Sequence, residues 1–144
     1  MLTGLQHAHS YVAYAALILL IVASINAIIG MTSNKEFKDG DRKLALFALI
    51  FTHVQLLVGL VLYFNSPMVT IFDLPMGEVM KNAELRLYAV EHPLINIIAV
   101  ALITVGFSKH KRATTDKAIF KSVAIMYAIG TILILSRIPW NNWL

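Results

Sequence analysis

The sequence predicts an all-α integral membrane protein, an antiparallel bundle of four transmembrane helices that forms a single domain over residues 1–144. Three observations predict this fold. Hydrophobic residues make up 58% of the chain and charged residues only 14%, far from the averages of soluble domains. The apolar residues gather in four stretches, each of about the 20 residues that a helix needs to cross a hydrocarbon core of about 30 Å. Most of the basic residues lie in the short segments between those stretches.

The four spans are separated by short polar connections and one longer one. We expect the spans at about residues 11–30, 44–64, 87–107 and 122–140. The longest connection is residues 65–86, between the second and third spans. Pro67 and Pro75 are helix stops within it, and residues 76–84 can form a short interfacial helix.

The distribution of basic residues predicts the orientation of the bundle. Two connections, residues 31–43 and 108–121, lie at the same end of an antiparallel bundle. They carry Lys35, Lys38, Arg42, Lys43, Lys109, Lys111, Arg112, Lys117 and Lys121. The opposite end carries only Lys81, Arg86 and Arg137. The positive-inside rule therefore places the two basic connections in the cytoplasm and predicts a bacterial inner-membrane protein with both termini on the periplasmic side.

Charge and cysteine content narrow the function classes. The net charge of +4 could suggest nucleic acid binding, but the basic residues occur in short runs between apolar stretches, so we expect no nucleic acid partner. The chain has no cysteine, which excludes disulfides, thiolate ligands, iron–sulfur clusters and covalent attachment of c-type haem. Any haem would be bound non-covalently.

Several ionisable groups fall within the expected spans, where each costs at least about 2.5 kcal/mol and needs a partner or a function. Counted at about 1.5 Å per residue from the cytoplasmic edge, His53 lies near the middle of the bilayer at roughly 15 Å. His92 and Arg137 lie at roughly 22 Å. We expect His9, Glu91, His92 and Arg137 to gather in the outer leaflet, with His53 below them. We also expect His53, His92, Asn96 and Arg137 to line the interior of the bundle.

The surroundings of His92 favour a local opening. Pro93 lacks the amide that would otherwise bond the carbonyl of Ala89, so either the third helix begins near His92 or a longer helix is interrupted there. Tyr88 and Asn96 lie four residues before and after His92, which puts all three side chains on one helical face.

Ordinary packing roles compete with a site at each of these positions. Glu91 and Arg137 can form an ion pair that only fixes helix packing, and His9 near a span end can be an interfacial anchor. The buried side-chain amides of three residues can form interhelical hydrogen bonds: Asn26, Gln55 and Asn96. The first span also presents a stripe of mostly small residues, which favours close packing but could leave space for a flat macrocycle: His9, Ala13, Ala16, Leu20, Ala23 and Ala27.

The buried histidines predict a cofactor site, most plausibly for haem b. Histidines from two helices can ligate one haem iron from opposite faces. His53 with His92 is the first expected pair, His9 with His92 is a second, and a single histidine is a third. Arg137 would neutralise propionates, with Glu91 and Asn96 in support.

Two other uses of the same residues remain open. A metal site without haem would draw on His9, His53, His92 and Glu91, and a proton pathway would follow the buried polar residues. We find no constellation for hydrolysis, so any enzymatic role is expected to be redox at most.

Segments along nearly the whole chain carry a family resemblance. HAHSYVAY, LIFTHVQLLVGLVLYF, EHPLINI, SKHKRA and LSRIPW resemble short four-span bacterial membrane proteins labelled cytochrome b-like. The resemblance implies a membrane-embedded b-type haem protein for electron transfer, with His9, His53, His92 and Arg137 as its site positions.

The competing class is a small accessory subunit without a cofactor, packed beside a larger respiratory or export complex. Residues 65–86 would then be its docking surface. Beside the lipid bilayer, these alternatives imply a larger membrane complex or a homo-oligomer, and a quinone or another redox partner.

Overall fold

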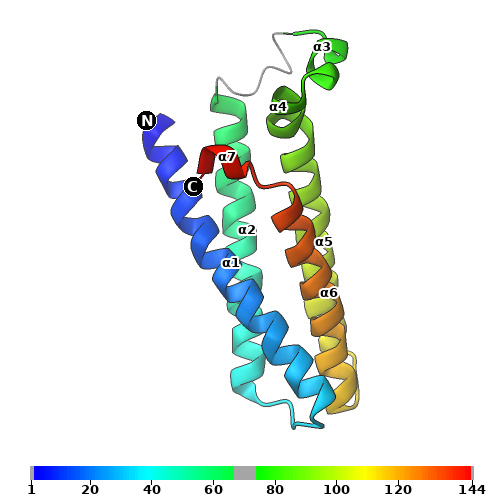
Figure 1. Ribbon diagram of the computed structural model, residues 1–144. Helices are drawn as coiled ribbons and strands as arrows, with labels where there is room; N and C mark the ends of the chain where they lie inside the picture. Colours follow the sequence, from blue (N-terminus) through cyan, green and yellow to red (C-terminus); the bar gives the residue numbers. More distant parts are fainter. Residues whose placement is uncertain (1, 67–73, 144) are drawn as a thin grey trace.

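The computed structural model describes residues 2–66 and 74–143, and the regular elements within those ranges are all helices (Figure 1). The long helices are α1 (Leu2–Thr32), α2 (Asp39–Asn65), α5 (His92–His110) and α6 (Asp116–Ser136). The short elements are α3 (Met76–Lys81), α4 (Ala83–Arg86), the π-helical turn η1 (Leu87–Glu91) and α7 (Trp140–Trp143). The predicted all-α class is confirmed.

Four helices are long and apolar enough to cross a membrane, which agrees with the predicted number of spans. They are α1, α2, α6 and the continuous helix Ala83–His110, formed by α4, η1 and α5. Each of these helices is longer than its predicted span. The fourth is also shifted along the chain: α6 begins at Asp116 instead of residue 122 and ends at Ser136, because the chain then reaches Pro139, which lacks a helical amide.

The connection between the second and third spans contains the expected short helix. α3 begins directly after Pro75, and Asn82 caps α4 by accepting hydrogen bonds from the amides of Glu84 and Leu85. Pro67 lies outside the described residues.

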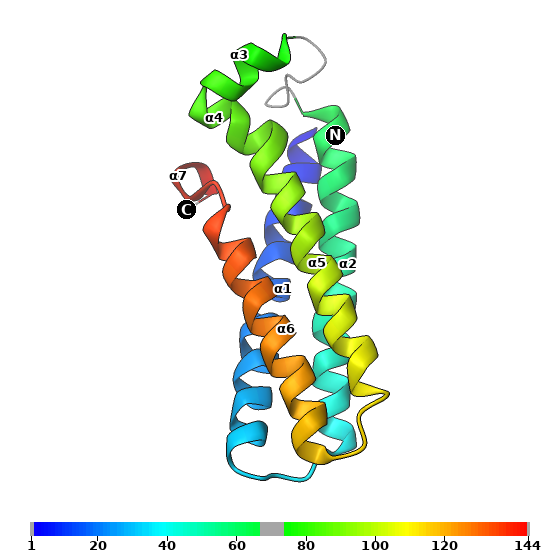
Figure 2. The same ribbon diagram turned by 90° about the vertical axis from the view of Figure 1, so that its right-hand side faces the viewer.

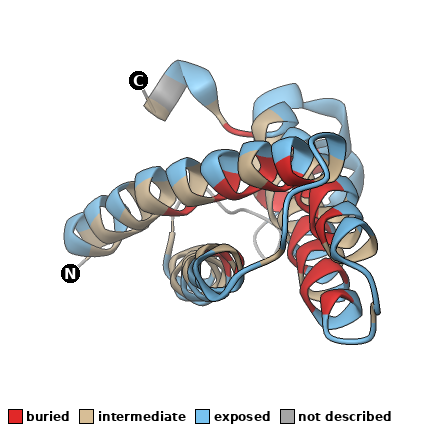
Figure 3. Cartoon of the chain, turned by 90° about the horizontal axis from the view of Figure 1, so that it is seen from below, coloured by how far each residue is buried: buried red, intermediate tan, exposed pale blue. Residues whose placement is uncertain are grey.

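The bundle is antiparallel, with the termini and α3 at one end and the two basic connections at the other (Figures 1 and 2). We call these the terminal end and the basic end. α1 runs obliquely across the bundle, so its N-terminal half leads away from α6 (Figures 1 and 3). The two ends are therefore packed differently.

The core is concentrated toward the basic end. Buried residues of α1 begin only at Ala16, and the last buried residue of α2 is Thr52. Helices approach closely there because small residues face large ones. A Cβ added to Gly30 would lie 2.5 Å from the ring of Phe120, which is fully buried. Such contacts replace the hydrophobic driving force that is missing between helices in lipid.

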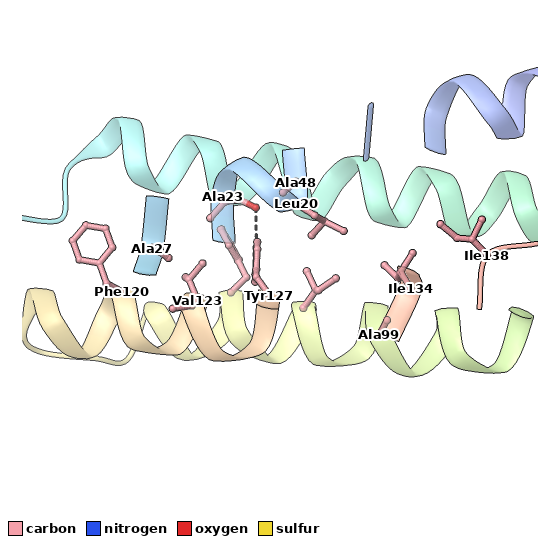
Figure 4. Packing of buried hydrophobic residues seen from close by; sticks show 14 residues of the cluster. Leu20, Ala23, Ala27, Ala48, Ala99, Phe120, Val123, Tyr127, Ile134 and Ile138 are labelled. Atoms are coloured by element: carbon pink, nitrogen blue, oxygen red, sulfur yellow. Dashed lines mark hydrogen bonds between the residues drawn. The ribbon is translucent and has the colours of Figure 1, made fainter. Parts of the chain in front are cut away.

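Polar bonds also join helices near the basic end. The Tyr127 hydroxyl of α6 donates to the carbonyl of Ala45 in α2 over 2.8 Å (Figure 4). The Asn26 amide of α1 donates to Asp41 at the start of α2 over 2.9 Å, which confirms its interhelical role. His110 is not a loop residue as expected from the predicted boundary. It ends α5 and is 6% exposed, against the rings of Phe37 and Phe107.

Candidate functional site

A cavity of about 540 Å³ lies between the helices toward the terminal end. All four long helices contribute to its walls, and most of the lining is apolar. The volume falls within the range of about 300–1,000 Å³ that is common for small-molecule and cofactor sites. The polar side chains of the lining that matter below are His9, Gln55, Tyr63, Tyr88, His92 and Asn96.

Two histidines from different helices lie next to each other in the lining of this cavity. The rings of His9 in α1 and His92 in α5 have centroids 6.1 Å apart and planes inclined at 79°. His9 can approach α2 because Gly59 has no side chain: a Cβ there would lie 3.2 Å from Cε1 of the imidazole. The structure thus brings together the second of the histidine pairs expected from the sequence.

The hydrogen bonds of His92 determine its tautomer. Its Nδ1 lies 2.9 Å from the backbone carbonyl oxygen of Arg137, which can only accept, so Nδ1 carries the proton. The Asn96 amide lies 3.4 Å from the same nitrogen and donates more closely, over 2.6 Å, to the carbonyl of His92 itself. A neutral imidazole then keeps its lone pair on Nε2. Metal-ligating histidines commonly have this arrangement, with the other ring N–H bound to a backbone carbonyl.

His9 is held by an amide of the neighbouring helix. Gln55 Nε2 lies 3.1 Å from His9 Nδ1, while Gln55 Oε1 is buried and has no hydrogen-bond partner within the described part of the chain. If the side-chain amide of Gln55 is turned over, its Oε1 and Nε2 exchange places, and Oε1 accepts a hydrogen bond from the Nδ1–H of His9. The Nε2 of His9 then keeps its lone pair, as the Nε2 of His92 does. This wall of the cavity therefore contains an unsatisfied polar atom that a bound group could partner.

The helix that carries His92 contains a π-helical turn immediately before it. The amide of His92 bonds the carbonyl of Leu87, five residues earlier. Pro93 cannot supply the amide that an α-helix would give to Ala89, and the Tyr63 hydroxyl of α2 donates to that carbonyl instead, over 2.8 Å. Of the two expectations for Pro93, the longer interrupted helix is therefore the correct one. Tyr88, His92 and Asn96 all line the cavity, as their spacing predicted.

Beside His92, a charge cluster lies at the surface of the terminal end. Glu91 accepts from Arg86 Nε over 3.0 Å, and Arg137 Nε lies 3.9 Å from its other oxygen. The expected ion pair with Arg137 is present, but Arg86 is the closer partner. Arg137 itself is exposed beyond the end of α6, so the expectation that it lines the bundle interior is wrong. With two arginines and one carboxylate, the cluster is cationic.

His53 does not line the interior, which corrects the sequence-based expectation. It is exposed on α2, with Nδ1 2.8 Å from the Leu49 carbonyl and Nε2 3.4 Å from the Thr104 hydroxyl. The neighbouring Thr52 points inward and is buried. Since both ring nitrogens of His53 have local partners, its exposure costs less than its depth alone suggested. The first expected pair, His53 with His92, is not brought together in this cavity.

Sequence reasoning missed the residues that support the histidines. The carbonyl released by Pro93 signalled that a donor was needed, but nothing in the sequence identified Tyr63 as that donor. Gly59 was not singled out, although a glycine within an apolar helix often marks a close approach. Gln55 was considered as an interhelical hydrogen-bonding residue and as part of a proton pathway, but not as the partner of His9, through which it joins α2 to α1.

The fold and the cavity define a small four-helix membrane protein with a histidine-lined internal site. Comparison with protein-family models, with curated proteins and with solved structures found no match to this chain. Function must therefore be inferred from the side chains themselves.

Proposed function

We propose that this chain is a b-type haem protein of the bacterial inner membrane that transfers electrons, and that His9 and His92 would hold the haem iron. The observation that carries the proposal is the pair of imidazoles that lie together in the lining of a mostly apolar cavity, with 6.1 Å between ring centroids. The pair replaces His53 with His9 relative to the first expectation from the sequence.

The spacing of the two rings fits one shared metal. An imidazole nitrogen lies about 2.0 Å from a bound metal, and the ring centre about 1.1 Å further, so two rings on opposite sides have centroids about 6 Å apart. The perpendicular ring planes are compatible with this, because each imidazole can rotate about its own metal–nitrogen bond.

The donor set favours haem over a bare metal ion. Among the described residues, no group of three or more histidine, cysteine, aspartate or glutamate side chains is placed to hold a metal. A structural or catalytic zinc or copper site uses three or four protein ligands. Haem brings four nitrogens of its own and asks the protein for only one or two. When bound, it would supply one-electron redox chemistry.

The chain's own residues would bind and orient the group. The Arg137 carbonyl fixes the His92 ring and makes its Nε2 a better donor, while Gln55 and Gly59 hold His9. The cationic cluster of Arg86, Glu91 and Arg137 offers positive charge for propionates. The apolar walls would exclude water.

The charge asymmetry of the loops supports a periplasmic location for this site. With the basic end in the cytoplasm, the cavity lies in the outer leaflet, and a quinone or another redox partner would approach from there.

The decisive experiment is a reduced-minus-oxidised spectrum of protein purified from haem-replete cells. We expect non-covalent haem b with low-spin bands. His9→Ala and His92→Ala should each abolish or convert those bands. His53→Ala is the matched control, because it removes an imidazole from the neighbouring helix outside the cavity and should leave the spectrum unchanged.

Two outcomes would overturn the proposal. Loss of the bands in His53→Ala with their survival in His9→Ala would reject this ligand pair. A colourless protein without metal would reject haem altogether and favour the cofactor-free accessory subunit, which reproducible co-purification within a larger respiratory or export complex would then support.

A further inference from the structure

We propose that the groove between α5 and α6 at the basic end binds the headgroup of one anionic phospholipid. The groove has a volume of about 270 Å³ and is lined by Lys109, Ala118, Lys121, Ser122, Ile125 and Met126. It lies at the opposite end of the bundle from the histidine cavity, so the inference does not depend on haem.

The two lysines are the cationic part of this groove. Lys109 lies in the last turn of α5 and Lys121 in the second turn of α6, and both are exposed. Neither ammonium group makes an ion pair with a described residue. Two lysines of the neighbouring connection differ, because Lys43 lies 3.1 Å from Asp39 and Lys35 lies 3.6 Å from Asp41. The groove therefore has positive charge without a protein counter-ion.

Apart from Ser122, whose hydroxyl donates to the Ala118 carbonyl over 3.0 Å, the remaining lining is apolar and continues away from the lysines along α6. From Lys121, the helix passes Ile125 about 6 Å deeper into the span, where 41% of that side chain is exposed. Gly106 brings the two helices together behind the groove, since a Cβ there would lie 2.6 Å from Met126 Cβ. A phosphate between the ammonium groups would thus have an apolar wall below it for the first part of an acyl chain.

A lipid fits this combination better than a soluble anion does. Basic pockets between transmembrane helices on the cytoplasmic side are typical sites for anionic lipid headgroups. Lysine stems can lie along the apolar wall while their ammonium groups reach the headgroup level. A free phosphate would gain nothing from Ala118, Ile125 and Met126.

Native mass spectrometry in detergent can test the site with phosphatidylglycerol and, for comparison, phosphatidylcholine. We expect one tightly retained phosphatidylglycerol and much weaker retention of phosphatidylcholine. Lys109→Gln with Lys121→Gln should weaken phosphatidylglycerol binding about 30-fold, at about fivefold per lysine. The control Lys38→Gln with Lys43→Gln removes the same charge from the same end, and its effect should be less than about twofold. Circular dichroism would verify the folding of each variant.

A third variant tests the shape of the groove independently of its charge. Ala118→Phe keeps both lysines but fills the groove beside them, and it should weaken binding as strongly as the double lysine variant. Equal losses in the control double variant would show non-specific surface charge and overturn the proposal. So would full competition by inorganic phosphate, or normal binding to Ala118→Phe. Should the double lysine variant not fold, the single variants decide, each expected to lose about fivefold.

Discussion

The two ends of the bundle use opposite packing strategies. Toward the basic end, small residues let the helices touch, as at Gly30 against Phe120. Toward the terminal end, α1 leads away from α6, and the helices surround a mostly apolar cavity to which a few polar side chains contribute. Since lipid tails solvate apolar side chains as well as another helix does, helices pack only where their surfaces fit closely. Where they do not fit closely, space remains for a ligand.

The terminal end also contains both helix-breaking prolines of the last two spans. Pro93 leaves the Ala89 carbonyl without its α-helical donor, and Pro139 does the same to Leu135. In each case an aromatic side chain donates instead: Tyr63 over 2.8 Å and the Trp140 indole over 3.1 Å. The membrane offers no water for such carbonyls, so the bundle can open here only because side chains replace the lost bonds.

The largest loss of stability should come from adding a methyl group at the close helix contact near the basic end. Gly30→Ala places a methyl group against Phe120, whose ring is fully buried and cannot move aside. We expect the free energy of unfolding in detergent to fall by about 3 kcal/mol, the upper part of the range for overpacking. Gly40→Ala is the control, since a Cβ there meets nothing within 4 Å and should cause no loss. A stable Gly30→Ala protein would show that the basic end is not closely packed.

Intermediate losses of stability are expected when either of two tyrosine hydroxyls is removed, one toward each end of the bundle, and the two losses should differ. Tyr63→Phe leaves the Ala89 carbonyl without a replacement for the amide that Pro93 lacks, and should cost about 2 kcal/mol. Tyr127→Phe removes a donor from the carbonyl of Ala45, which lies within a regular helix, and should cost about 1 kcal/mol. Chemical unfolding of both variants measures the difference.

The same pair also sharpens the functional contrast between the ends. Tyr63→Phe should change the spectrum of bound haem, because the π-helical turn that it stabilises precedes His92. Tyr127→Phe should not. If both variants lost stability equally and neither changed the spectrum, Tyr63 would be a packing residue only.

These contrasts show what sequence could predict and what it could not. The length of apolar stretches and the basic connections predicted four helices and their antiparallel order, because both depend on composition along the chain. Counting residues along a helix also predicted heights: His92 and Arg137 were expected at the same depth, and the His92 ring does bond the Arg137 carbonyl.

The direction in which a side chain points was harder to predict. His53 and Thr52 are neighbours at nearly the same depth, yet Thr52 is buried and His53 is exposed. Which of them faces inward depends on how α2 is rotated against the other helices. The faces of α2 differ little in hydrophobicity, so the sequence gives no strong signal for that rotation. For the same reason His9 was the second choice as a partner of His92, although it is the one that the bundle brings opposite.

The smallest effect on stability, but a specific one on the site, is expected at Gly59. A Cβ there would lie 3.2 Å from the His9 ring, a contact tight by only a few tenths of an ångström, at the half-open end where α1 can shift. Gly59→Ala should therefore change the free energy of unfolding by less than about 1 kcal/mol, since the gain in helix propensity offsets part of the contact. The imidazole would nevertheless be displaced from its position opposite His92, so the low-spin haem bands should weaken or shift. Gly4→Ala, in the first turns of the same α1 helix as His9 and without a neighbour within 4 Å, should leave the spectrum unchanged and cause no loss of stability. An unaltered spectrum in Gly59→Ala, together with normal haem content, would mean that His9 is not held against α2 in the bound protein and that the iron takes His92 without it.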